Sequence, residues 1–122
     1  MRSQTAFFRS LLEAPDADDD GTPDTSDNCI DLPNGPDEPD PGGYIQLDTD
    51  SDGFGDACDC DFDQEMTCSI RDFWFFLIDF WVATDSGIGT DMDGNGAVSI
   101  ADFSLFRDGY VAGEPGPSGL VP

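Results

Sequence analysis

The sequence contains no lysine and no histidine, and its only basic side chains are four arginines. They are opposed by 27 acidic residues, so the formal net charge at pH 7 is −23. Nucleic acid and anionic membranes would repel a chain of this charge, and neither is expected as a partner. Because the chain also lacks a recognisable nucleophile beside a base, we do not expect an enzyme.

Long hydrophobic runs are also missing. The longest apolar stretch, residues 73–83, is too short to cross a bilayer and contains Asp79, so no membrane insertion is expected. Residues 1–15 lack the continuous apolar core of a signal peptide. We expect them to form a short lead-in with some helical character, which Pro15 ends.

Acidic residues recur at positions 1, 3, 5, 9 and 12, or close to that pattern, in four windows of twelve residues. This spacing lets a short loop surround Ca²⁺ with side-chain oxygens at positions 1, 3, 5 and 12, a carbonyl at position 7, and position 9 often through water. An acidic chain rich in glycine and proline also has the composition of a disordered chain. The regular placement favours metal binding. The windows are residues 16–27, 48–59, 61–72 and 91–102.

The first two windows supply complete sets of candidate ligands, and both have glycine at position 6, where the loop turns sharply. In the first window the expected ligands are the side chains of Asp16, Asp18, Asp20, Asp24 and Asp27 and the carbonyl of Thr22. In the second they are the side chains of Asp48, Asp50, Asp52, Asp56 and Asp59 and the carbonyl of Phe54.

The last two windows supply similar sets. The fourth would bind through Asp91, Asp93, Asn95 and Asp102, through the carbonyl of Ala97, and through Ser99 by way of water. The third would bind through Asp61, Asp63, Glu65 and Asp72, with the Thr67 carbonyl and Ser69. Position 6 of the third window is Met66, which lacks the freedom of glycine at positive φ. We therefore expect about four calcium sites, of which the third binds more weakly or is distorted.

The windows fall into two parts with different hydrophobic patterns. Residues 16–59 have almost no apolar periodicity and include an irregular insert, residues 31–43, so ordering there must come from metal and cross-links. Residues 61–112 are an internal duplication with a spacing of 30, in which each window leads into an apolar pattern of helical period. The expected fold is mostly irregular calcium-bound loops plus a small all-α module over residues 60–112, with few or no strands. A disordered tail rich in proline and glycine is expected over residues 113–122.

Four cysteines could form a zinc site or a disulfide framework. The chain has no Cys-x-x-Cys pair and no histidine, so the ligand spacing of zinc is missing. An even number of cysteines beside acidic loops indicates disulfides and an oxidising, extracellular or cell-surface location. Since no export signal is present, we expect the chain to be the carboxyl-terminal piece of a longer secreted protein.

Over residues 16–59 the pattern DxDxDGxxDxxDNC followed by DxDxDGxGDxCD resembles thrombospondin type 3 repeats. The resemblance implies repeats wrapped around a line of Ca²⁺ and a disulfide between Cys29 and Cys58. The insert departs from the family, whose usual linker is shorter. Cys60 and Cys68 would then be left to each other, and their bridge would brace the third window. The alternative is that Cys68 is a plain core residue, because its counterpart in the duplication is the apolar Val98.

The duplicated half, two acidic loops each leading into a helical pattern, resembles a dockerin-type pair of EF-hands. Aspartate at position 12 of both loops fits that family. Cellulosomal members of that family bind cohesin, with specificity at loop positions 10 and 11 and at residues further along the helix. The two loop positions here are Ile70-Arg71 and Ile100-Ala101. These pairs depart from the small, hydroxyl-rich pairs of cellulosomal dockerins, so a cohesin-like partner is only weakly supported.

The two helical patterns differ on one side. Positions that are apolar in both copies are expected to form the shared core, and these are Phe73 and Phe103, Phe76 and Phe106, and Phe80 and Tyr110. Trp74, Leu77 and Ile78 are apolar in the first copy only, and such a patch usually marks an interaction surface. The alternative is that the asymmetric module or the insert covers it.

These observations predict an extracellular, calcium-stabilised module that mediates attachment or protein–protein interaction at the end of a larger secreted protein. The alternative is a purely structural spacer, stiffened by calcium and without a partner of its own.

Overall fold

The computed structural model describes residues 15–121. These residues contain two α-helices, α2 (Ile70–Val82) and α3 (Ile100–Ala112), and two single-turn 3-10 helices, η1 (Asp24–Ser26) and η2 (Asp56–Cys58). The rest of the described chain is turn, bend and coil, without a strand. The prediction of a small, mostly irregular fold with few or no strands is therefore confirmed for this part of the chain. The lead-in expected over residues 1–15 lies, except for Pro15, outside the described residues.

Both α-helices begin in the same way. Ser69 precedes α2 and donates its backbone N–H to the Asp72 carboxylate, with nitrogen and oxygen 2.8 Å apart. Ser99 and Asp102 make the same bond at the start of α3, also at 2.8 Å. This reciprocal cap pairs backbone donors that the first helical turn leaves free. Each helix ends at a residue of left-handed conformation, Ala83 after α2 and Gly113 after α3.

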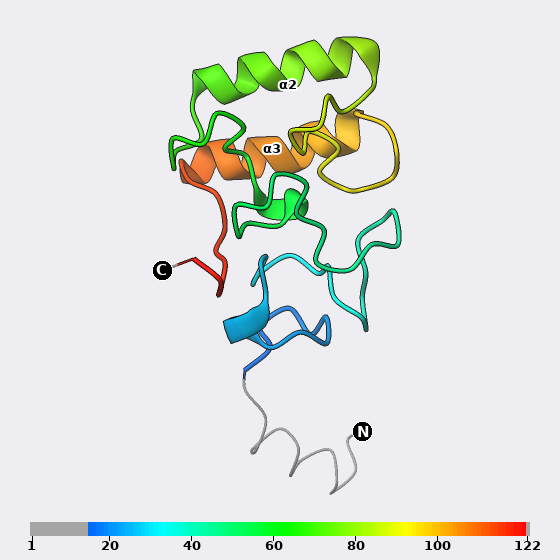
Figure 1. Cartoon of the computed structure of the whole chain (residues 1–122), viewed down its shortest axis with the longest axis vertical. Helices are drawn as coiled ribbons and strands as arrows, with labels where there is room; N and C mark the ends of the chain where they lie inside the picture. The colour runs from blue at the N-terminus through cyan, green and yellow to red at the C-terminus, as the bar shows by residue number, and fades with distance from the viewer. Residues whose placement is uncertain (1–14, 122) are drawn as a thin grey trace, which may run out of the picture.

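The two helices lie one above the other and run in opposite directions (Figure 1). Phe106 is at the centre of their contact, with ring centroids 5.5 Å from Phe76 and 5.8 Å from Phe73. The shared core predicted from the duplication is present, because Phe76 and Phe106 are buried and Phe73, Phe80 and Phe103 pack against them. Tyr110 differs, since it is 44% exposed and lies at the edge of the core, with its ring centroid 5.9 Å from that of Phe106.

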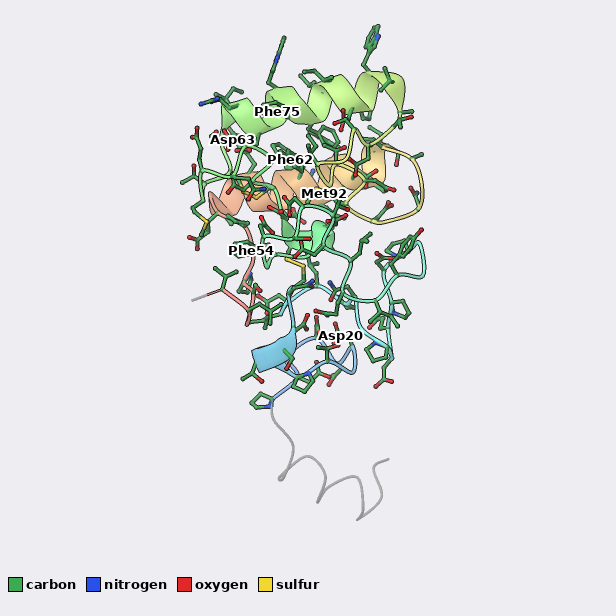
Figure 2. The ribbon with its side chains drawn as sticks, in the orientation of Figure 1. Asp20, Phe54, Phe62, Asp63, Phe75 and Met92 are labelled. Atoms are coloured by element: carbon green, nitrogen blue, oxygen red, sulfur yellow. A yellow bond between two sulfur atoms is a disulfide. The ribbon has the colours of Figure 1, made fainter. Side chains whose placement is uncertain are left out.

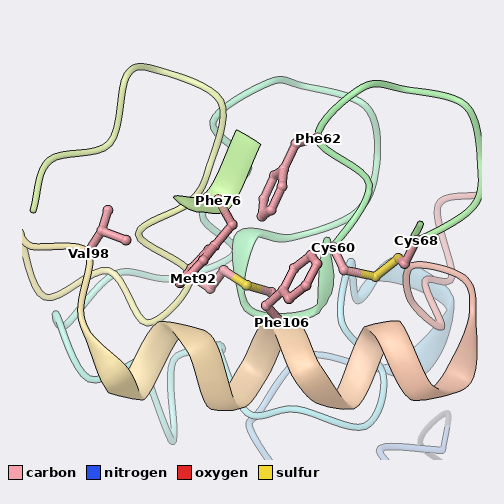
Figure 3. Close-up of a cluster of buried hydrophobic side chains, with 7 residues drawn as sticks. All are labelled: Cys60, Phe62, Cys68, Phe76, Met92, Val98 and Phe106. Atoms are coloured by element: carbon pink, nitrogen blue, oxygen red, sulfur yellow. A yellow bond between two sulfur atoms is a disulfide. The ribbon is translucent and has the colours of Figure 1, made fainter. Parts of the chain in front are cut away.

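Position 2 of the third and fourth windows contributes two further core residues that the sequence analysis missed. Phe62 and Met92 are both buried, and the Phe62 ring stacks on Phe106 with centroids 5.7 Å apart. Figure 3 shows them with the other buried members of the cluster, Cys60, Cys68, Phe76, Val98 and Phe106. The sequence does contain a signal for their burial, because both copies of the duplication have an apolar residue at this offset. The loops themselves therefore help to build the core.

The first half is organised around one disulfide and a polar network. Cys29 and Cys58 are bonded, and Ala57 and Leu32 pack around them. The Gln46 side chain accepts the N–H of Asn28 at 2.8 Å and donates to the Asp27 carboxylate at 2.9 Å. A second disulfide joins Cys60 to Cys68, so both expected pairings are present. Except for this small cluster, the expectation that residues 16–59 lack an ordinary core agrees with the structure.

Residues 113–121 pack against the first half, although a disordered tail was expected over residues 113–122; residue 122 lies outside the described residues. Gly116 donates its N–H to the Cys58 carbonyl at 3.0 Å, and Gly119 donates to the Asp27 carbonyl at 2.8 Å. The Ser118 hydroxyl donates to the Gly53 carbonyl at 2.6 Å. Figure 1 shows this segment returning from the end of α3 toward the first half. The tail pairs with loop carbonyls that no strand or helix satisfies.

The insert also makes a contact across the molecule. Gly42 donates its N–H to the Asp93 carbonyl of the fourth window at 3.1 Å. A methyl group on Gly42 would lie within van der Waals overlap of the Gly94 carbonyl, which is a backbone atom and cannot rotate away. The insert therefore joins the first half to the fourth loop, and it does not cover α2.

We expect Gly42→Ala to destabilise the folded protein by about 1–3 kcal/mol, because the added methyl group forces the insert away from the fourth loop. Chemical denaturation in the presence of calcium measures this change. The neighbouring variant Pro41→Ala, at an exposed residue, serves as the control. A Gly42→Ala protein as stable as the control would contradict the contact.

Candidate metal centres

Each of the four windows brings carboxylates together. In every cluster one oxygen from each member lies within 4.8 Å of the others. Asp20 of the first cluster and Asp63 of the third lie in opposite halves of the molecule (Figure 2). The clusters are Asp16, Asp18, Asp20 and Asp27; Asp48, Asp50 and Asp52; Asp61, Asp63 and Asp72; and Asp91, Asp93 and Asp102.

The four windows share one backbone shape, in which positions 4 and 6 both have positive φ. At position 4 the φ angles are 54° for Asp19, 57° for Ser51, 62° for Gln64 and 72° for Gly94. At position 6 they are 93° for Gly21, 93° for Gly53, 68° for Met66 and 99° for Gly96. Met66 therefore takes the conformation that glycine takes elsewhere, in a region where a side chain is strained. The third loop keeps the shared shape at the cost of that strain.

Hydrogen bonds within the loops explain this shape. In all four windows the carboxylate at position 1 accepts the N–H of position 6, as Asp91 accepts from Gly96 at 2.8 Å and Asp61 from Met66 at 2.6 Å. The corresponding bonds in the first two windows, Asp16 with Gly21 and Asp48 with Gly53, are 3.0 Å long. Each bond turns the chain back on itself, so that the carboxylates of positions 1 and 3, and in the first two windows that of position 5, gather inside the loop.

Position 9 has a different role in each half. In the first two windows its carboxylate accepts the N–H of position 2, at 2.9 Å from Ala17 to Asp24 and at 2.8 Å from Thr49 to Asp56. Asp24 and Asp56, which were expected to be ligands, thus close their loops and lie outside the clusters. In the last two windows position 9 is the serine that caps the helix.

The aspartate at position 12 is also not placed alike in all windows. Asp72 and Asp102 belong to their clusters and also accept the N–H of position 3, from Asp63 at 3.1 Å and from Asp93 at 2.9 Å. Asp59 stands apart from the tight cluster of its window, but its carboxyl is close to Asp50 and Asp52. Burial, together with those two charges, raises the pKa of Asp59 to about 10. The carbonyls expected at position 7, of Thr22, Phe54, Thr67 and Ala97, stay predictions, as does ligation by Ser69 and Ser99.

Buried carboxylate oxygens without a hydrogen-bond partner occur in all four clusters. They are Asp16 Oδ1, Asp18 Oδ2, Asp27 Oδ2, Asp50 Oδ1, both Oδ atoms of Asp63, and Asp91 Oδ1. A buried, unpaired oxygen is costly, and it is more so when it carries charge. Ca²⁺ takes six to eight oxygen ligands, many of them carboxylates. The donor set and its unpaired oxygens therefore fit calcium.

Crowding also changes the acidity of the clusters. Burial, followed by the charge of Asp27, raises the pKa of Asp18 to about 7. Burial and the neighbouring Asp48 raise the pKa of Asp50 to about 7. In the second half, burial raises the pKa of Asp102 to about 6. Several of these carboxyls would therefore hold protons near neutral pH unless a cation offsets their charge.

The third loop contains one more charged contact. Arg71 Nη1 lies 2.8 Å from Glu65 Oε1, and Arg71 Nε lies 3.6 Å from Asp63 Oδ2. Glu65, expected as a ligand, is thus bonded to an arginine and lies outside the cluster. From the sequence, Arg71 was identified only as position 11 of the loop, and no contact with the ligands of this site was expected.

The outer face of α2 is apolar and uncovered. Trp74 is 66% exposed, Ile78 51% and Leu77 38%, so the residues expected to contact a partner are accessible. Trp81 and Val82 extend the same open groove. They were missed because their counterparts in the second copy, Val111 and Ala112, are also apolar. We call these five residues the α2 patch.

Comparison with known proteins identifies no relative, since no protein-family model, no curated protein and no solved structure matches the chain. Among the described residues, no helix is both long and apolar enough to cross a membrane.

The raised pKa values predict how pH affects the metal-free chain. The unfolded carboxyls titrate near 3.8, whereas Asp18 and Asp50 titrate near 7 in the fold. Their stabilising contribution is therefore complete below about pH 4 and is lost as the pH rises through about 7. In chelator, the free energy of unfolding should fall over this range, as measured by denaturation followed by circular dichroism. With calcium the fall should disappear, because the cation replaces the protons. Stability that rises between pH 4 and 7 in chelator would contradict this account.

Proposed function

We propose that the chain is an extracellular calcium-binding module whose fold depends on bound calcium and which attaches to a protein partner. The observation that carries the proposal is the fourfold recurrence of one loop shape around crowded carboxylates. All four clusters contain buried oxygens that lack a partner. A single loop of this kind would be weak support, whereas four with matching backbone angles and hydrogen bonds support a repeated cation site.

Calcium would be held by the cluster carboxylates and would offset their mutual repulsion. Four ions would change the formal charge from −23 to about −15, and binding energy would become folding energy. In the second half each loop leads into a helix of the shared core, which supports the interpretation of residues 61–112 as a dockerin-like pair of EF-hands. In the first half the disulfide between Cys29 and Cys58 supports the likeness to thrombospondin type 3 repeats.

The same chemistry supports an extracellular or cell-surface location, which is part of the proposal. Two disulfides and no free cysteine occur in the described residues, as in proteins of oxidising compartments. Calcium is also abundant outside cells, where sites of moderate affinity stay filled. No catalytic role is part of the proposal.

The α2 patch supports attachment to a partner. It presents two tryptophans beside Leu77, Ile78 and Val82, and aromatic residues dominate the energetics of many interfaces. A second copy of this chain is a poor occupant, because two molecules repel each other even when four calcium ions have changed the charge of each from −23 to about −15. We therefore propose a different protein as the partner. If the chain were a spacer without a partner, the apolar side chains of the α2 patch would remain exposed to water.

Calorimetric titration tests the calcium sites. We expect the wild-type chain to bind at least three calcium ions, and Asp93→Asn to bind one fewer or to lose about tenfold or more in the affinity of one site. Asp108→Asn removes an exposed carboxylate outside the clusters and should leave the titration unchanged. A wild-type stoichiometry below two would contradict the proposal.

Capture experiments test the attachment. Purified, calcium-loaded chain should retain a specific protein from the secreted and surface fraction of its source, and Trp74→Ser with Ile78→Ser should abolish that retention while the circular dichroism spectrum stays unchanged. Val111→Ser changes a similarly exposed apolar residue of α3 outside the patch and serves as the matched control. If both variants retain the same proteins as wild type, the patch is not the attachment surface. If the wild type itself retains nothing specific, the spacer alternative is favoured.

A further inference from the structure

We propose that Arg71 sets the calcium affinity of the third site, so that this site fills at a higher calcium concentration than the fourth. The inference rests on the proposed calcium-binding function and adds the residue that makes two otherwise similar loops unequal. Arg71 is at position 11 of the third window, and the equivalent residue of the fourth window is Ala101.

The geometry places the Arg71 guanidinium over two expected ligands. Its Nη1 donates to Glu65 Oε1 at 2.8 Å, and its Nε lies 3.6 Å from Asp63 Oδ2. The Asp63 side chain is 6% exposed, and neither of its carboxylate oxygens accepts a hydrogen bond. These oxygens are therefore available to a cation, and Arg71 is the positive charge beside them.

Arg71 would oppose calcium in two ways. A divalent ion at the cluster would be repelled by the guanidinium beside the same carboxylate. The Glu65 carboxylate is held by Arg71 and would have to exchange that pair for the ion. The pair is largely exposed, so the cost is modest and the site remains able to bind.

The fourth loop is the comparison for the third, because it has no arginine at this position. Its position 5 is the neutral Asn95, which accepts the N–H of Ala97 at 3.1 Å. Its position 11 is the exposed Ala101, which carries no charge. The carboxylates at positions 1, 3 and 12 are otherwise the same in both loops. The strained Met66 adds to the difference, but the shared backbone shape is kept despite it.

The difference in calcium affinity between the third and fourth sites affects the α2 patch, because the third loop leads directly into α2. Asp72 belongs to the third cluster and also accepts the N–H of Ser69, the residue that caps this helix. Filling the third site therefore fixes the start of the helix that carries the patch. Arg71 would set the calcium concentration at which the patch is fully ordered.

Nuclear magnetic resonance can follow each site separately in the full chain. The Met66 and Gly96 N–H groups donate to the position 1 carboxylates of the third and fourth loops, so their amide signals report on their own sites. In the wild type we expect the Met66 signal to shift at a higher calcium concentration than the Gly96 signal. Arg71→Ala should lower the Met66 midpoint by about threefold to tenfold and leave Gly96 unchanged. Ala101→Arg should raise the Gly96 midpoint by about twofold or more.

Arg107→Ala is the matched control, since it removes the same charge from α3, where Arg107 pairs, among the described residues, with the exposed Asp108. This variant should leave the calcium midpoints of the Met66 and Gly96 signals unchanged. Equal wild-type midpoints for Met66 and Gly96, or an unchanged Met66 midpoint in Arg71→Ala, would overturn the inference while leaving calcium binding intact. An equal shift in Arg107→Ala would overturn it as well, because the effect would then come from net charge. If neither amide responds to calcium in any variant, the proposed function fails together with the inference.

Discussion

Crowded carboxylates are the constraint on which the rest of this structure depends. Asp20, Asp27, Asp61, Asp72 and Asp102 are all fully or almost fully buried, and each belongs to a cluster of like charges. Hydrogen bonds from loop N–H groups satisfy many of their oxygens, but one oxygen of Asp27 and several oxygens of other cluster members, such as Asp63, remain without a partner. Like charges at these distances oppose folding unless protons or cations offset them. The loops are shaped to gather charge, and a cation would make that arrangement stable.

The two halves meet this constraint with different scaffolds. In the second half the position 12 aspartate is both a cluster member and the cap of a helix, so one carboxylate links the loop to the aromatic core. In the first half the position 9 aspartate closes the loop, and a disulfide with a Gln46-centred polar network takes the place of a core. The halves are nevertheless in contact, since η2 packs against α3 and the insert and the tail both cross between them. The boundary at Cys60 therefore separates a half held by a disulfide and polar contacts from a half held by an aromatic core, and the two halves remain in contact.

The sequence was sufficient for features that repeat at fixed offsets. The two helices, the carboxylates at positions 1 and 3, those at position 5 of the first half, the position 12 aspartates of the second half and the aromatic core all follow from the duplication and the loop spacing. Contacts that depend on how loops meet in space were not accessible. Gly42 approaches Gly94, and Gly119 bonds to Asp27, because of tertiary geometry that no periodicity encodes. The role of Arg71 was overlooked for the same reason, since only the fold shows that its side chain turns back toward Glu65 and Asp63.

The central claim is that neutralising the carboxylate clusters holds this chain in its compact form. Small-angle X-ray scattering at neutral pH, with calcium and then with excess chelator, tests it most directly. A compact chain of this length has a radius of gyration of about 14 Å, and an unfolded one about 36 Å. We expect a value near the compact limit in calcium and a large expansion toward the unfolded limit in chelator, reversed when calcium is restored. An unchanged, compact radius in chelator would contradict the account.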